Sequence, residues 1–122
     1  MQKREPYFED SSKIWKLCET RQAEGFVSAL TFANIVYVMR KELNPKMIET
    51  VLKYLAMIFN FVDLSSADLT NAAEMLWDDF EDAVQASTAA RIHAHSIITR
   101  NIKDFQASSV AALTPTEFLA RL

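Results

Sequence analysis

The chain has 122 residues, half of them hydrophobic, so it can bury the core of one domain, residues 1–122, and has no room for a second. Its formal net charge of -3 excludes capture of nucleic acid by overall charge, so an RNA ligand would need a local basic patch. No apolar run approaches the roughly 18 residues of a membrane span, and we expect a soluble, cytoplasmic protein without membrane contact.

The first part of the chain alternates one helix with one short strand. Hydrophobic spacing predicts a helix over residues 7–23, which ends at Gly25, the only glycine of the chain. A short buried strand is expected at residues 26–30. Thr31 is the expected N-cap of the following helix, which ends near residue 42.

The middle of the chain repeats this alternation. Asn44 and Pro45 predict the start of a third helix, with Pro45 at its first position. An alternating strand is expected at residues 59–63. The stretch 65–68 then predicts the cap of a helix that reaches Leu76.

The last part of the chain contains an acidic helix between two further strands and a short terminal helix. The acidic helix is expected from about Asp79 to Ala94, followed by a strand at Ile97–Ile98. A weaker strand is expected at residues 110–113, and Thr114 begins the terminal helix. Strands that alternate with helices predict a parallel three-layer α/β fold, with helices on both faces of the sheet.

Polar side chains that suit a ligand site occur at two places in this last part. At about 3.6 residues per turn, Asp78 and Asp82 share a helix face, and Asp79 lies beside them. Asn101 and Asp104 follow the strand that ends at residue 99, and ligands of open α/β sheets bind where the strands end. A structural interpretation stays open for both places, because acidic residues offset the helix dipole and Asn and Asp also suit turns and caps.

Basic side chains are spread along the chain, and together they supply the candidates for a local basic patch. Most of them have the plainer interpretation of a solvated surface. The candidates are Lys13, Lys16, Arg21, Arg40, Lys41, Arg91, Arg100 and Lys103.

Five stretches in this order and spacing resemble the PIN domains, a family of metal-dependent ribonucleases that includes the toxins of bacterial toxin–antitoxin pairs. The resemblance covers nearly the whole chain. The stretches are Arg4–Phe8, Ser28–Thr31, Asp79–Ala83, Thr99–Asn101 with Asp104–Phe105, and Thr114–Leu119.

The resemblance implies a three-layer α/β/α PIN-like fold with a short parallel sheet and a site for Mg²⁺ or Mn²⁺ at its edge. Carboxylate and amide oxygens are the ligands that such hard cations prefer. The implied catalytic residues are Asp82, Asn101 and Asp104, the implied metal ligands are these three with Asn34 and Asp79, and the implied RNA-binding residues are Arg100 and Lys103.

The sequence departs from the family pattern at two places. The first aspartate of PIN domains ends an amino-terminal strand, and this sequence starts after that point, so we expect an amino-terminally truncated domain whose first strand is missing. Asn34 stands where many members have a glutamate. With less negative charge in the site, the metal ion is expected to be weakly bound or absent.

The missing strand would lie between the strands at 26–30 and 96–99. We expect these two strands to close on each other, or a second copy of the chain to cover the gap in a homodimer. Buried backbone groups left without partners cost roughly 1–3 kcal/mol each, so some such cover is needed.

Two functions follow as hypotheses. The first is a metal-dependent endoribonuclease of the toxin type, which a cognate antitoxin protein inhibits and whose activity the truncation can abolish. The alternative is a non-catalytic PIN-fold remnant that acts as a protein-interaction module through a pair of exposed apolar helices.

Overall fold

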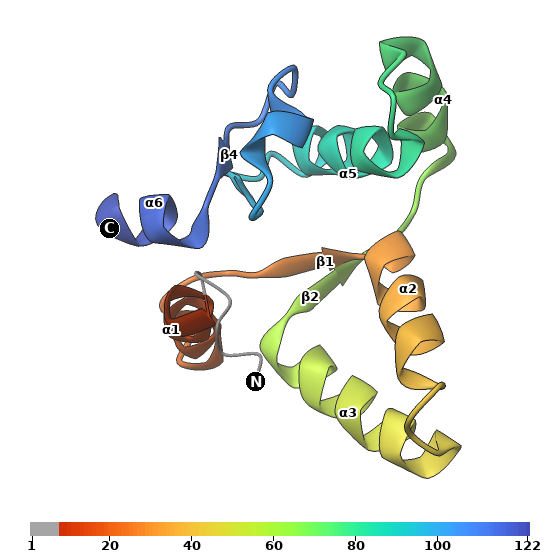
Figure 1. The fold of residues 1–122 in the computed structure, drawn as a ribbon, viewed down its shortest axis with the longest axis vertical. Helices are drawn as coiled ribbons and strands as arrows, with labels where there is room; N and C mark the ends of the chain where they lie inside the picture. Colours follow the sequence, from red (N-terminus) through yellow and green to blue (C-terminus); the bar gives the residue numbers. More distant parts are fainter. Residues whose placement is uncertain (1–7) are drawn as a thin grey trace. The chain divides into compact units, whose positions relative to one another are not determined.

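The computed structural model describes residues 8–122, so residues 4–7 of the first family-like stretch lie outside the described part (Figure 1). Helices alternate with very short strands along the chain. The elements in order are α1 (Phe8–Glu19), β1 (Phe26–Ser28), α2 (Ala29–Met39), α3 (Pro45–Ile58), β2 (Asn60–Val62), α4 (Ser66–Met75), α5 (Phe80–Arg91), β3 (Ile97–Ile98), the 3-10 helix η2 (Ile102–Phe105), β4 (Ala112–Leu113) and α6 (Pro115–Ala120).

The chain divides into two compact units. The α2–α3 unit comprises Leu17–Leu64, and the α4–α5 unit comprises the chain as far as Lys16 together with Ser65–Leu122. Each unit contains one pair of parallel strands: β1 pairs with β2, and β3 pairs with β4. The predicted α/β fold with short parallel strands is therefore confirmed, and the strands form two separate pairs.

In the α2–α3 unit, the strand β1 is shorter than the sequence predicts and α2 begins earlier. Ser28, not Thr31, is the N-cap of α2, and its hydroxyl accepts a hydrogen bond from the backbone N–H of Thr31 at 3.1 Å. Both residue types cap helices well, so the end of the strand decides which one does. The prediction of Thr31 as the cap was wrong by three residues.

The same unit packs around the place where Gly25 meets the start of β2. A side chain at Gly25 would bring a Cβ within 2.5 Å of the Phe59 ring and 3.0 Å of the Cys18 sulfur, so only glycine fits there. Burial raises the pKa of the Cys18 thiol, which keeps it protonated and unreactive. The centroids of the Phe32 and Phe61 rings lie 4.3 Å apart, and this contact holds α2 against β2.

In the α4–α5 unit, three helix starts follow the predicted chemistry. Ser65 and Asp68 form a capping box at the start of α4, and Thr114 and Glu117 form another at the start of α6. Asp79 caps α5. Between them, β3 and β4 join through backbone hydrogen bonds such as that from the N–H of Ile97 to the carbonyl of Ala111 at 2.9 Å.

The α4–α5 helix pair is joined by a buried carboxylate. Asp68 is only 1% exposed, and its oxygens accept hydrogen bonds from Nε and Nη2 of Arg91 at 3.0 Å and from the Thr88 hydroxyl at 3.0 Å. It also accepts the capping bond from the Ser65 N–H at 3.2 Å. Burial by itself raises the pKa of Asp68, but the hydrogen bonds from Arg91, Ser65 and Thr88 outweigh it and lower the pKa below its ordinary value.

Among residues 8–122, every helix is too short or too polar to cross a lipid bilayer.

The Asp68 network generates a first prediction about stability. Replacing Asp68 with alanine removes half of the capping box of α4 and leaves Arg91 without its buried partner, so the free energy of unfolding should fall by about 1.5–3 kcal/mol, the range for hydrogen bonds to charged groups. Urea unfolding followed by circular dichroism measures this change. Glu74→Ala, at an exposed position of the same helix, is the control and should change the midpoint little. Equal effects of the two substitutions would contradict the role of Asp68.

The lowered pKa of Asp68 also predicts a pH dependence. Because the pKa is lower in the folded than in the unfolded chain, the stability that this carboxylate contributes is fully present above the unfolded value of about 3.9 and is lost as the pH falls through the folded pKa. Thermal unfolding measured from pH 6 downward should therefore show a loss of stability in the acid range. In Asp68→Asn the loss of stability that is due to this carboxylate should be absent. If this variant lost as much stability in acid as the natural chain, Asp68 would not be the source of the pH dependence.

Candidate functional site

The candidate site is built on the turn from α4 into α5. Leu76 ends α4 in the left-handed backbone conformation, at φ 59°, which turns the chain sharply so that α5 begins only four residues later. Asp79 is the N-cap of α5, and its Oδ1 accepts a hydrogen bond from the N–H of Asp82 at 3.0 Å. Because the helix begins after Asp79, Asp78 stands outside it, and the predicted shared helix face of Asp78 and Asp82 is wrong.

Asp82 is the half-buried carboxyl at the centre of an acidic cluster. Burial raises its pKa, and the negative charges of Asp79, Asp104 and Glu81 raise it further. The positive end of the helix dipole favours an anion at this position, but burial and repulsion exceed that effect. The cluster therefore joins the start of α5 to η2, as the sequence predicts for Asp79, Asp82 and Asp104.

An aromatic contact holds the two segments of the cluster together. The ring of Trp77, two residues before the α5 cap, meets the ring of Phe105 edge to face with centroids 6.0 Å apart. Phe105 is buried and directly follows Asp104. The packing of these two rings fixes η2 beside α5, and so fixes Asp104 near Asp82.

Asn101 stands at the start of η2 with its side chain unused as a cap. Its backbone takes part in the turn, since its N–H donates to the Thr99 hydroxyl at 3.1 Å and its carbonyl accepts from the N–H of Asp104 at 3.0 Å. The side chains of Asn101 and Asp104 are both exposed. Of the structural alternatives left open for Asn101, the turn is formed by its backbone, and its side chain makes no capping bond.

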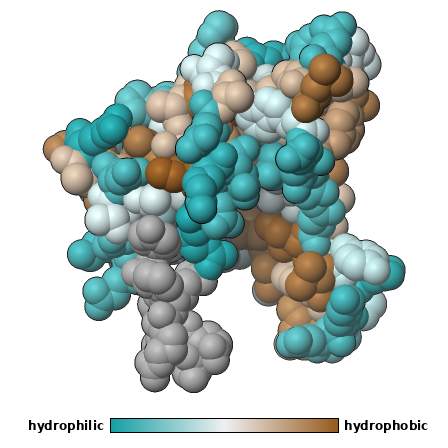
Figure 2. Space-filling view, turned by 45° about the horizontal axis from the view of Figure 1, so that its top comes forward, coloured by the Kyte–Doolittle hydropathy of each residue, from teal (hydrophilic) through white to brown (hydrophobic). Residues whose placement is uncertain are grey.

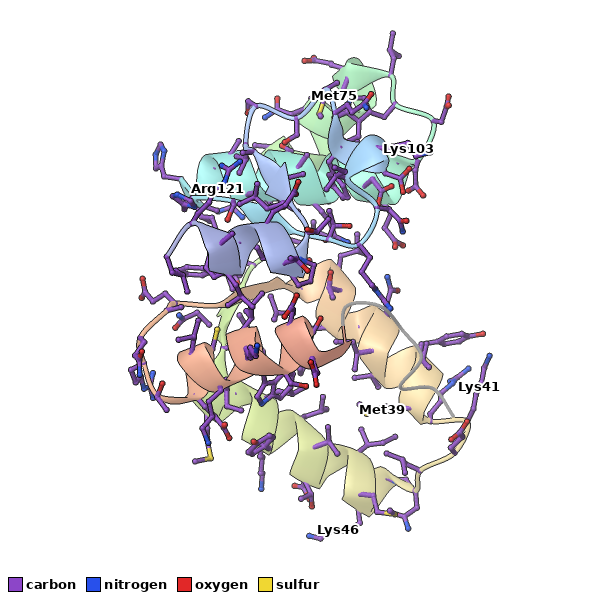
Figure 3. The ribbon with its side chains drawn as sticks, turned by 60° about the vertical axis from the view of Figure 1, so that its left-hand side comes forward. Met39, Lys41, Lys46, Met75, Lys103 and Arg121 are labelled. Atoms are coloured by element: carbon purple, nitrogen blue, oxygen red, sulfur yellow. The ribbon has the colours of Figure 1, made fainter. Side chains whose placement is uncertain are left out.

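Two exposed cations flank Asn101 in the same turn. Arg100 precedes it, and Lys103 lies on η2 one residue before Asp104. Figure 3 shows the Lys103 side chain at the surface of η2. These are the positions that the family resemblance assigns to phosphate binding.

Asn34 belongs to the α2–α3 unit, apart in the chain from the other candidate residues. Counted from the true cap, Ser28, it lies in the second turn of α2, and its side chain is exposed. Its inclusion in the site therefore rests on the resemblance alone.

The donor atoms of the acidic cluster suit a hard divalent cation. Within residues 8–122, however, no three acidic, histidine or cysteine side chains are placed so that one ion could touch them all. Mg²⁺ is commonly bound by one or two carboxylates together with waters and substrate phosphates, and this is the coordination that the cluster fits. The described residues form an electronegative cluster and not a complete metal cage.

The sequence reasoning missed two sets of side chains that position this cluster. The first is the pair Trp77 and Phe105, whose signal was an aromatic residue beside each acidic segment. The second is the bond from Arg91 to Asp68, which fixes the far end of α5. Arg91 was grouped with the surface cations, but its charge is used inside the unit.

Comparison with known protein families gives a match over most of the chain. The matching family is described as PIN domain, and the match spans residues 1–103. No curated protein matches the chain at a significant level.

The raised pKa of Asp82 predicts that this residue destabilises the folded chain at neutral pH. The loss in the free energy of unfolding starts as the pH rises through the pKa of Asp82 in the unfolded chain, about 3.9. It is complete above the pKa of Asp82 in the folded chain. Asp82→Asn should therefore be more stable than the natural chain at pH 7, by less than about 1 kcal/mol because the group is half exposed and screened.

Thermal unfolding of both proteins at pH 7 and near pH 3 measures the effect, which should vanish in acid. Asp78→Asn, at an exposed carboxyl outside the helix, is the matched control. A loss of stability in Asp82→Asn at pH 7 would show that the carboxylate stabilises the fold instead.

Proposed function

Since the chain belongs to the PIN domain family, whose members are generally nucleases that bind RNA, we propose that it cleaves RNA with a divalent cation, Mg²⁺ or Mn²⁺, bound at Asp82. The observation that carries this proposal is the position of Asp82, half-buried and beside Asp79, Asp104 and Glu81; burial first and then these negative charges raise its pKa. Carboxylates held together against their repulsion, beside exposed cations, are typical of a functional site.

In this proposal the chain's own residues supply the ligands. Asp82 would bind the cation with an oxygen, and Asp104 and Asp79 would contribute negative charge beside it. The side-chain amide of Asn101, at the start of η2, would add a further oxygen. A cation at this place relieves the repulsion that raises the pKa of Asp82.

The reaction is the hydrolysis of a phosphodiester. A water oxygen forms a bond to phosphorus, the bond from phosphorus to the leaving sugar oxygen breaks, and that oxygen takes up a proton. The divalent cation lowers the pKa of the attacking water and stabilises the charge that develops on the phosphate. In this proposal Asp104 accepts the proton of the water, and Arg100 and Lys103 bind phosphate oxygens.

We further propose that the two units form one PIN domain over residues 1–122 and that the chain acts as a toxin restrained by a cognate antitoxin protein. A homodimer is the proposed assembly. The support is the apolar surface of the α2–α3 unit, where Val38, Met47 and Met57 are exposed. Exposed apolar patches of this kind mark protein–protein contacts.

A second candidate function has its own observation. Figure 2 shows hydrophobic side chains at the surface in the region of α2 and α3. A groove of about 420 Å³ lies there, and its apolar lining comes from α2, α3 and β2, chiefly Phe32, Ile48, Leu52 and Phe61. A chain that has kept this groove and lost metal binding would act as a protein-interaction module without catalysis.

Cleavage of RNA tests the proposed function. The chain should cut a labelled single-stranded RNA when Mn²⁺ is present and not when it is removed with EDTA. Asp82→Asn should reduce the rate by at least about 100-fold, since losing even an indirect partner of a metal ligand costs 10- to 100-fold. Glu74→Gln, an exposed acidic residue of α4, should cut as the natural chain does.

The other outcomes separate the candidates. Cutting that persists in Asp82→Asn would exclude Asp82 as the metal-binding residue and point to a contaminating nuclease. A folded chain that never cuts RNA with Mg²⁺ or Mn²⁺ would favour the protein-interaction module.

A further inference from the structure

A second cluster with binding chemistry lies at the end of α2, in the α2–α3 unit. The ring of Tyr37 is 54% exposed and carries two cations: the guanidinium carbon of Arg40 lies 4.5 Å and the ammonium of Lys41 lies 5.5 Å from the ring centroid. We call Tyr37, Arg40 and Lys41 the Tyr37 patch. All three residues come from one turn of chain and need no contact from the other unit.

The backbone of this turn is well defined by hydrogen bonds. The N–H of Arg40 donates to the carbonyl of Val36 at 3.0 Å, and the N–H of Lys41 donates to the carbonyl of Val38 at 3.3 Å. The N–H of Leu43 closes the turn on the carbonyl of Met39 at 2.9 Å. The two cations are therefore held beside the ring by the course of the chain, and Figure 3 shows Lys41 projecting outward from the end of α2.

Both cations of the Tyr37 patch contact the Tyr37 ring. Within residues 8–122, neither Arg40 nor Lys41 forms an ion pair with a carboxylate. The nearby lysines of α3 differ, because Lys46 and Lys53 both pair with Glu49 at 3.3 Å. In a chain whose net charge is -3, two unpaired cations on an exposed aromatic ring are a local site for an anion.

We propose that the Tyr37 patch is a binding subsite for single-stranded RNA, remote in sequence from the acidic cluster. This inference rests on the proposed function for its choice of ligand. A base stacks on the exposed part of the Tyr37 ring or on the guanidinium plane of Arg40, and the adjoining phosphates bind Arg40 and Lys41. The subsite holds the RNA and takes no part in the chemical step.

The chemistry of the patch favours RNA over an acidic peptide. An acidic peptide would satisfy the two cations but has no aromatic plane to place against the Tyr37 ring. Single-stranded RNA offers a base and a phosphate in every nucleotide, which matches an aromatic ring bordered by cations. The contact is independent of a divalent cation, so it is measurable without cleavage.

Binding of a short, labelled single-stranded RNA to the full chain in EDTA tests the subsite by fluorescence anisotropy. Tyr37→Ala should weaken binding by about tenfold, within the range for losing one base–aromatic stack. Tyr37→Phe, which keeps the ring, should bind as the natural chain does. The double variant Arg40→Gln, Lys41→Gln should reduce the slope of log affinity against log salt by about 1.4, the value for two phosphates of a single strand.

Two control variants match these changes elsewhere on the surface. Tyr54→Ala removes a tyrosine of α3 that is 44% exposed, and Lys46→Gln removes an exposed cation at the start of the same helix. Neither should alter RNA binding. Circular dichroism of every variant establishes that the fold is retained, which is expected because all these side chains are exposed.

The subsite would be overturned if the natural chain did not bind RNA in EDTA, or if Tyr37→Ala bound RNA as tightly as the natural chain. It would also be overturned if a poly-glutamate peptide, and not RNA, bound in a way that depends on Tyr37. Equal affinity for an abasic strand would exclude stacking. If the natural chain cleaves RNA and Tyr37→Ala binds RNA equally well, the subsite alone is refuted. If RNA binding depends on Tyr37 but the chain does not cleave RNA, the nuclease function alone is refuted.

Discussion

The buried carboxylate of Asp68 is the constraint on which the α4–α5 unit depends. One side chain closes the capping box of α4 and accepts three hydrogen bonds from Thr88 and Arg91 near the end of α5. A buried charge is tolerated only when its oxygens are satisfied, so α4 and α5 can meet in one register. The position of α5, and with it the place of Asp82 at its other end, follows from this bond.

Stabilising and destabilising contacts are therefore separated along a single helix. The end of α5 near Arg91 gains hydrogen bonds, while the start near Asp82 holds carboxyl groups that repel one another. A rigid helix between the two ends lets the favourable contacts offset the unfavourable ones. This division is common in proteins whose working site is strained, because function there requires groups that the fold alone would not select.

The features that the sequence predicted correctly are local ones. Asn44, Ser65 and Thr114 cap their helices through bonds to residues two or three positions away, so neighbouring residues decide the outcome. Asp79, Asp82 and Asp104 also have local signals, since each segment carries its own acidic residues, and their role in a site stays a prediction. The bond of Asp68 to Arg91 spans 23 residues and the contact of Trp77 with Phe105 depends on tertiary packing, and neither leaves a periodic pattern in the sequence.

The shortness of the strands has a consequence for how the chain opens and folds. With three residues in each of β1 and β2 and two in each of β3 and β4, the strand pairs supply few ladder bonds. In the α4–α5 unit, the amides best shielded from hydrogen exchange are then those of the two helices and not those of the strands. Contacts close in sequence dominate such a unit, so its helix pair is suited to form early, with β3 and β4 joining afterwards.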